Sequence, residues 1–149
     1  VRAAKAADLS VMRLLVDNGA DATLTTRNGI NPLMAAAGLG TSDSDSIGRY
    51  KSEPEMIDAI QMMLDAGLDI NAAERRGRTA VHGAALLGFD QVLRFLGEKG
   101  AAMDTADSNG VTPLDAALGR AGGFGFSGAD GVVRESTAEV IQELLAQGQ

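Results

Sequence analysis

The sequence contains no cysteine and no tryptophan, and histidine occurs once. Without cysteine there is no disulfide framework and no thiolate metal site, and a single histidine makes a zinc site improbable. Long apolar runs are also missing, since no segment approaches the ~20 apolar residues of a membrane-spanning helix. The net charge of −7 argues against a nucleic-acid-binding protein, which is usually basic. We therefore expect no membrane insertion, no metal and no cofactor, while the lack of cysteine is compatible with either an oxidising or a reducing compartment.

Glycine, in contrast, recurs at regular intervals. One set of glycines follows apolar stretches, with intervals of 48, 33 and 48 residues: Gly19, Gly67, Gly100 and Gly148. A second set opens Gly-x-Thr-Pro-Leu-like stretches with intervals of 48 and 33 residues: Gly29, Gly77 and Gly110. Two independent landmarks that keep one period indicate a repeat protein, in which some units carry an insert of fifteen residues.

The residues between these landmarks identify the repeat. A small-residue helix follows each Gly-x-Thr-Pro-Leu-like stretch, as in Gly83-Ala84-Ala85, and an apolar helix precedes each glycine of the first set, as at 92–96. A short polar hairpin comes next, as at 67–72. This pattern resembles the ankyrin repeat family, whose unit of about 33 residues has a turn, two helices and an outward finger. The resemblance implies an all-α ankyrin-repeat solenoid of helix–turn–helix repeats with short β-hairpin-like fingers.

Local chemistry agrees with this pattern. Thr79 and Thr112 stand just before an inner helix, where a hydroxyl can accept from free backbone amides. Pro32 and Pro113 suit the first helical turn, where a missing N–H costs nothing. We expect the four glycines of the first set to end the outer helices in the left-handed conformation.

His82 stands where the resemblance implies a histidine that braces the turn by hydrogen bonds. Met34 and Asp115 occupy the equivalent positions of the neighbouring repeats, and Asn31 replaces the threonine of the turn. Because His82 has this structural task, we expect no catalytic residue within the chain and no enzymatic activity.

The repeat boundaries give a single domain at 1–149. The predicted repeats cover about 1–26, 27–74, 75–107 and 108–149, and the first is partial because 1–7 aligns with 82–88. Both ends suggest a piece of a longer chain, because free-standing arrays usually close with polar capping repeats. Arrays with inserts of this kind resemble bacterial members of the family more than eukaryotic ones.

The two inserts, 41–55 and 121–135, fall between the inner and outer helices of the second and fourth repeats. They contain three of the five aromatic residues of the chain: Tyr50, Phe124 and Phe126. One interpretation is that these aromatics anchor a binding partner. The other is that they fold back onto the array and cover apolar helix ends, because a glycine-rich loop needs an apolar tether to be ordered.

Three motifs within the inserts have simple alternatives. The G-x-G-x-x-G string at 123–128 lacks the preceding strand and following helix of a nucleotide site. The calcium-like loop that starts at Asp43 has Pro54 where a bidentate glutamate is needed, so a small-ligand or calcium site is a minor alternative. Ser52 and Glu55 instead form a capping box that opens the outer helix.

The resemblance also implies a concave binding surface built from finger tips and inner helices. Carried over position by position, the candidate partner-binding residues are Arg27, Asn28, Ile30, Leu39, Arg75, Arg76, Arg78, Leu86, Leu87, Ser108, Asn109, Val111 and Arg120. Arginine and apolar side chains together are typical of binding hot spots. Alternatively, the arginines pair with nearby acids, Glu74, Asp104 or Asp107, and contribute little to binding.

We therefore expect a monomeric module that binds a protein partner through a rigid concave surface and two inserted loops. Such a pre-ordered surface loses little entropy on binding. The alternative is a regulatory or anchoring segment of a larger enzyme or transporter that contacts its own chain.

Overall fold

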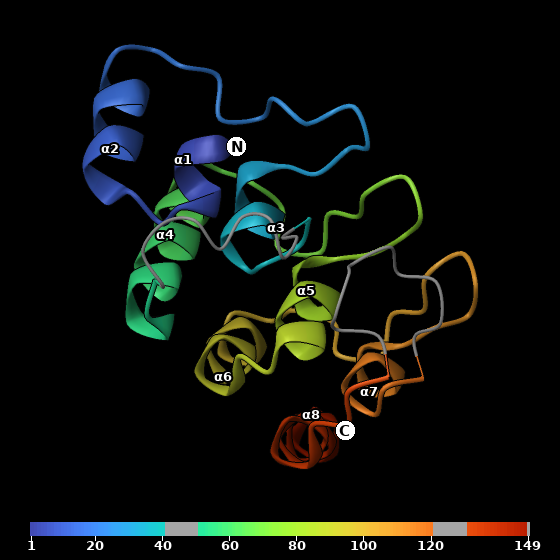
Figure 1. Ribbon diagram of the computed structural model, residues 1–149. Coiled ribbons are helices and arrows are strands. Elements are labelled where there is room, and N and C mark those ends of the chain that lie inside the picture. Colours follow the sequence, from blue (N-terminus) through green and yellow to red (C-terminus); the bar gives the residue numbers. More distant parts are fainter. Residues whose placement is uncertain (41–50, 121–130, 149) are drawn as a thin grey trace.

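The computed structural model describes residues 1–40, 51–120 and 131–148. These residues form eight helices, α1 (Arg2–Lys5), α2 (Leu9–Asp17), α3 (Pro32–Ala36), α4 (Glu53–Asp65), α5 (Ala80–Leu87), α6 (Asp90–Glu98), α7 (Pro113–Ala117) and α8 (Glu135–Gln147). The termini lie at opposite ends of the molecule (Figure 1). Long extended segments, which we call the first, second and third fingers, join each outer helix to the next inner helix at 18–31, 66–79 and 99–112.

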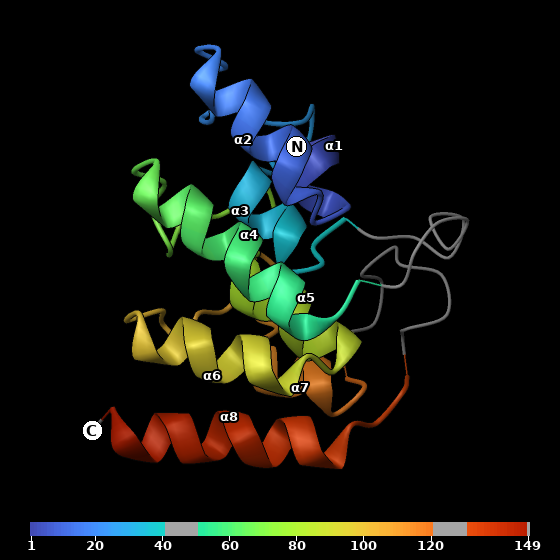
Figure 2. The same cartoon turned by 90° about the vertical axis from the view of Figure 1, so that its left-hand side faces the viewer.

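The helices form two layers. The outer helices α2, α4, α6 and α8 stack in chain order, and the inner helices α1, α3, α5 and α7 stack behind them (Figure 2). One continuous apolar core runs from Ala4 to Ile141, and it includes the fully buried Leu93 and Leu96 of the central outer helix. The all-α repeat stack predicted from the sequence is confirmed.

Small residues allow the inner helices to approach closely. Ala84 and Ala85 of α5 are fully buried. A Cβ atom on Gly83 would lie 2.7 Å from the backbone nitrogen of Leu39 and 3.1 Å from the carbonyl oxygen of Ala37. Glycine at this position therefore sets the distance between the second and third repeats.

The helix starts are capped by the residues that the sequence indicates. Asn31 accepts a hydrogen bond of 2.8 Å from the Met34 amide, and Thr112 accepts one of 3.2 Å from the Asp115 amide. The capping box between Ser52 and Glu55 is present at the start of α4. These side chains satisfy amides that an inner or outer helix leaves free in its first turn.

The helix ends agree with the prediction for three of the four glycines. Gly19, Gly67 and Gly100 have φ values of 79°, 87° and 87°, in the left-handed region. The prediction is wrong for Gly148, which has a φ of −81° and keeps the right-handed conformation. Its amide still donates to the carbonyl oxygen of Leu144, so it continues the helical hydrogen-bond pattern instead of reversing the chain.

The repeats with inserts differ from the central repeat in both of their helices. The inner helices α3 and α7 have five residues each, and α5 has eight. They end early because Gly38 and Gly119, with φ values of 96° and 70°, replace the helical Leu86 of the central repeat. The outer helices α4 and α8 have thirteen residues each, against nine in α6. Residues 53–55 and Glu135, counted with the inserts in the sequence comparison, therefore belong to the outer helices.

The ends of each insert are fixed by the repeats around them. At the first insert, Lys5 donates a hydrogen bond of 2.7 Å to the carbonyl oxygen of Gly40, and Lys51 donates to the carbonyl oxygen of Lys5. Burial, with a smaller effect from the nearby Lys5 charge, lowers the pKa of Lys51 to about 8. At the second insert, the amide of Arg134 donates a 2.8 Å hydrogen bond to the carbonyl oxygen of Ala117. The two flanks of the first insert therefore share Lys5 as a partner, and the flanks of the second insert are hydrogen-bonded to each other.

The N-terminal outer helix has an exposed apolar side. Leu14 is 62% exposed, and Val11, Leu15 and Val16 of the same helix are exposed as well. The other side of α2 packs against α4. Within the described parts of the chain, no helix combines the length and apolar character needed to cross a bilayer.

Candidate functional site

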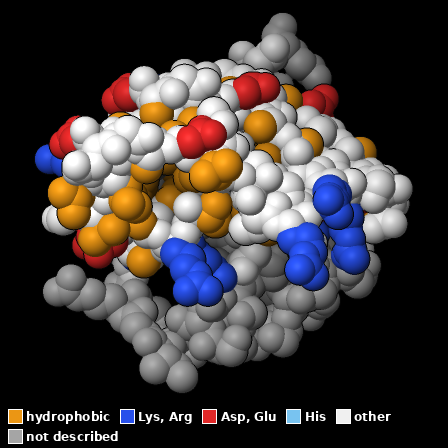
Figure 3. Space-filling view, turned by 90° about the horizontal axis from the view of Figure 1, so that it is seen from above, with side chains coloured by type: hydrophobic (Ala, Val, Ile, Leu, Met, Phe, Trp, Pro, Cys, Tyr) orange, Lys and Arg blue, Asp and Glu red, His pale blue; other side chains and the backbone are white. Residues whose placement is uncertain are grey.

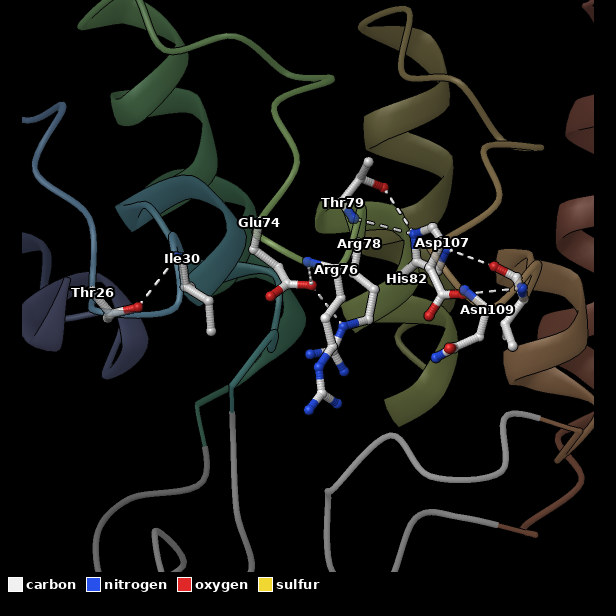
Figure 4. A network of polar contacts seen from close by, with 10 residues as sticks. Thr26, Ile30, Glu74, Arg76, Arg78, Thr79, His82, Asp107 and Asn109 are labelled. Carbon is white, nitrogen blue, oxygen red and sulfur yellow. Dashed lines mark hydrogen bonds and ion pairs between the residues drawn. The ribbon is translucent and has the colours of Figure 1, made fainter.

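Each finger ends in the same tight turn. The turns begin at equivalent positions, occupied by Thr26, Glu74 and Asp107 (Figure 4). In each turn the amide of the first residue donates a 2.9 Å hydrogen bond to the carbonyl oxygen four residues later, in Ile30, Arg78 and Val111 respectively. The repeated geometry places the two residues after each starting position at the finger tips.

The acidic side chains at these turns are occupied within the turns. One carboxylate oxygen of Glu74 accepts hydrogen bonds of 2.9 Å from the Arg76 amide and from Nε of Arg78. The Arg78 and Glu74 side chains are 8% and 2% exposed, so this is a buried ion pair. Asp107 accepts from the amides of Asn109 and Val111 at 2.8 and 3.1 Å. Neither carboxylate extends toward solvent to neutralise the exposed tips.

Backbone hydrogen bonds join neighbouring finger tips. The Arg75 amide donates to the Asn28 carbonyl oxygen at 3.1 Å, and the Ser108 amide donates to the Arg76 carbonyl oxygen at 2.7 Å. A Cβ atom on Gly29 would lie 3.3 Å from the Arg75 nitrogen, so the tips are in close contact. The three tips therefore form a continuous, pre-ordered ridge.

His82 links the third and fourth repeats beneath this ridge. Its Nδ1 accepts a 3.2 Å hydrogen bond from the Thr79 amide, and its Nε2 lies 3.1 Å from the carbonyl oxygen of Val111. An amide only donates and a carbonyl oxygen only accepts, so these contacts require the neutral tautomer with the proton on Nε2. Burial lowers the pKa of His82, outweighing the contacts that would raise it. The structural role expected for this histidine is confirmed.

Comparison with known proteins agrees with this geometry. The chain is 32% identical over 105 residues to ankyrin repeat and SOCS box protein 16 of Mus musculus, covering 70% of this chain and 22% of that protein. It is 37% identical over 57 residues to ankyrin repeat-containing protein P1E11.10 of Schizosaccharomyces pombe, covering 38% of this chain and 28% of that protein. The chain belongs to the ankyrin repeat family. Ankyrin repeats are generally protein-binding modules.

The similarity covers only part of each known relative. No family model matches the chain. Protein PhlB of Serratia liquefaciens is 44% identical over 62 residues, covering 41% of this chain and 27% of that protein. The ankyrin chain thus spans about a quarter of the length of each of these relatives. The relatives come from a mammal, a yeast and a bacterium, so they assign no source to the chain.

The predicted concave residues of this ankyrin stack differ in exposure. The exposed ones are Arg27, Asn28, Arg75, Arg76, Ser108, Asn109 and Arg120, and Leu87 and Val111 are half-buried. The prediction is wrong for four others, which were expected on the surface but are buried: Ile30, Leu39, Arg78 and Leu86. Ile30 and Leu39 pack with Met34 and Ala35, and Leu86 joins the main core. Arg78 is buried because its guanidinium pairs with Glu74.

Arg120 lies apart from the finger tips, after α7. Its guanidinium is 3.7 Å from Asp115, and its side chain is 68% exposed. Hydrogen bonds from Thr112, and to a smaller extent the Arg120 charge, lower the pKa of Asp115. Asp115 thus braces the turn of the fourth ankyrin repeat from the position that His82 occupies in the third.

The remaining sequence candidates fall in the inserts. Tyr50, Phe124 and Phe126, the glycine string at 123–128 and the acidic loop that starts at Asp43 lie outside the described residues, except for the end of that loop at 51–54. Over 1–40, 51–120 and 131–148, no three His, Asp or Glu side chains group in a way that could hold a metal ion.

Proposed function

We propose that the ridge of finger tips binds a protein partner. The ridge consists of Arg27 and Asn28, Arg75 and Arg76, and Ser108 and Asn109, all of them exposed. The observation that carries the proposal is the pair of backbone hydrogen bonds between successive tips, from Arg75 to Asn28 and from Ser108 to Arg76. Because the ridge is ordered before binding, the ankyrin stack loses little conformational freedom when a partner associates with it.

The composition of the ridge supports the same function. Arginine is enriched at binding hot spots, and asparagine and serine supply adaptable hydrogen-bonding groups. The three turns repeat the same geometry. Neighbouring tips therefore offer side chains at a regular spacing of about 8–10 Å, the usual distance between packed helices. A ridge of this kind suits a partner that contacts several repeats at once.

Photo-crosslinking tests this proposal directly. A photoreactive phenylalanine analogue is introduced at Asn28 or Asn109 on the ridge, and at the exposed Gln142 of α8 as the matched control. In an extract from the native source, the ridge positions are expected to give a specific crosslinked protein that Gln142 does not give. Crosslinking only from Gln142 would place the partner on the outer helices, and a crosslink within one polypeptide would favour the alternative of a segment that contacts its own chain.

A further inference from the structure

Three guanidinium groups are gathered on two adjacent finger tips. Arg27 and Arg75 occupy equivalent positions of the first and second fingers, and Arg76 follows Arg75. All three are exposed, and we call them the arginine row. In Figure 3, basic side chains lie mainly along the lower edge of the face shown, and acidic ones lie mainly along the upper edge.

No carboxylate of the described residues neutralises the arginine row. The ion pairs within these parts of the chain involve Arg78, Arg94 and Arg120, and none involves the row. The nearest acid in sequence, Glu74, is buried and is held by Arg78 and the backbone amide of Arg76 (Figure 4). The row therefore keeps a local positive charge on a chain whose net charge is −7.

The acidic residues of the described chain lie elsewhere. Many are exposed on the outer helices or at the bases of the fingers, including Asp17, Asp21, Asp58, Asp65, Asp69, Glu98, Asp104, Glu139 and Glu143. Among the described residues, the arginine row is thus separated from most of the exposed acids. Such segregation steers association toward a partner of complementary charge and disfavours partners of the wrong sign.

We infer that the arginine row binds an acidic, extended segment of a protein partner. This inference rests on the proposed function and specifies the chemistry of the partner. Guanidinium groups bind carboxylates with paired, charge-assisted hydrogen bonds. Stacked repeats follow one another at the usual helix spacing of about 8–10 Å, and an extended chain advances about 3.3 Å per residue. Acidic residues about three positions apart would therefore meet successive fingers.

A protein segment fits this surface better than a nucleic acid. The turns at 26–31, 74–79 and 107–112 contain no aromatic residue on which a base could stack. The row is also short, because it spans only two finger tips. The neighbouring Asn28, Ser108 and Asn109 can hydrogen-bond to the backbone or side chains of a peptide.

Fluorescence anisotropy with two labelled peptides tests the inference. One peptide of about twelve residues carries glutamate at every third position in a glycine–serine background, which matches the spacing of an extended chain, and the other carries glutamine at the same positions. The test variant combines Arg27→Glu, Arg75→Glu and Arg76→Glu. The control variant combines Arg13→Glu, Arg94→Glu and Lys99→Glu, three exposed positions on outer helices or next to one, with the same change in net charge.

We expect the glutamate peptide to bind at least about tenfold more tightly than the glutamine peptide at low salt, with the difference shrinking as salt screens the charges. The test variant should lose this preference, and the control variant should keep most of it. Equal binding of the two peptides, undetectable binding of the glutamate peptide or an equal loss in both variants would overturn the inference. So would tighter binding of a single-stranded oligonucleotide of the same length.

These outcomes are separable from failure of the proposed function. If a protein crosslinks at Asn109 but its contact segment is not acidic, the finger tips still bind a protein and the inference about its chemistry fails. If the glutamate peptide binds through the row but no protein crosslinks at Asn28 or Asn109, the proposed protein partner fails instead.

Discussion

The carboxylate of Glu53, at the start of α4, accepts a hydrogen bond of 2.7 Å from the backbone amide of Gln91 at the start of α6. The next amide, that of Val92, donates to the same oxygen at 3.0 Å. These amides have no cap from the residue at the start of their own helix, because the side chain of Phe89 makes no capping hydrogen bond. The extra helical turn at the end of the first insert therefore caps the helix of the following repeat.

Substitution of Glu53 by alanine should destabilise the whole stack. It removes the acceptor for two amides in the first turn of α6, and the loss of such a cap costs about 0.5–2 kcal/mol. Thermal or urea unfolding measures the effect. Glu139→Ala, at an exposed position of α8, serves as the control and should change stability by less than about 0.5 kcal/mol. Equal stability of the two variants would show that the Glu53 contact contributes nothing.

Two glycine-to-alanine substitutions should differ in their effect on stability. Gly83→Ala places a Cβ atom 2.7 Å from the backbone nitrogen of Leu39, which cannot move without separating two repeats. Gly97→Ala places one 2.9 Å from the end of the Leu144 side chain, which can rotate away. We expect a cost of about 1–3 kcal/mol or more for Gly83→Ala. At Gly97 the higher helix propensity of alanine, worth about 1 kcal/mol, should offset the contact. A chemical denaturation series of the two variants tests this order.

The repeat architecture could be predicted because it depends on short-range chemistry. Glycines at fixed intervals, capping residues and small inner-helix residues each recur with the period of the repeat. The altered helix lengths in the second and fourth repeats were not predicted. The short inner helices result from Gly38 and Gly119, which end them in the left-handed conformation where the central repeat has Leu86. Both glycines are visible in the sequence, but the fifteen-residue difference in length between repeats does not show where the helices on either side of an insert begin and end.

The exposed parts of the ridge were also predictable from position, whereas burial within the turn was not. The sequence offered pairing of the finger-tip arginines with Glu74 as an alternative, and the fold shows that Arg78 alone makes this pair and is buried with it. The i,i+4 spacing of Glu74 and Arg78 was the available signal. A cap that reaches across 38 residues, such as Glu53 to Gln91, leaves no local pattern in the sequence.

The three arginines of the second finger should therefore differ in their effect on stability. Arg78→Glu leaves a buried, unpaired Glu74 beside a second carboxylate, and breaking a buried ion pair costs about 3–5 kcal/mol. Arg75→Glu and Arg76→Glu alter exposed side chains and should each cost less than about 0.5 kcal/mol. Melting curves of the three single variants distinguish these expectations. Similar melting temperatures for all three would contradict the structural role of the Glu74–Arg78 pair.

His82 should make stability depend on pH near neutrality. Its pKa is lowered by burial from the ordinary value of 6.5, so the unfolded chain binds a proton that the folded chain does not. The stability that comes from this difference is complete above the pKa of His82 in the unfolded chain and is lost as the pH falls below that value. Because His82 is the only histidine, His82→Gln should remove most of the dependence between about pH 5.5 and 7.5, a range above the ordinary carboxylate pKa values. If the free energy of unfolding changed with pH as steeply in the variant as in the original chain, this role of His82 would be contradicted.

Protein binding by the finger-tip ridge is tested most directly by mapping the partner's footprint. Backbone amide resonances of the isotope-labelled chain of 15.3 kDa are recorded with and without the crosslinked partner, added as the free protein. We expect the largest shifts at Arg27, Arg75, Arg76, Ser108 and Asn109, with little change along α4, α6 and α8. Shifts concentrated on those outer helices, with the finger tips unchanged, would contradict the proposed binding surface.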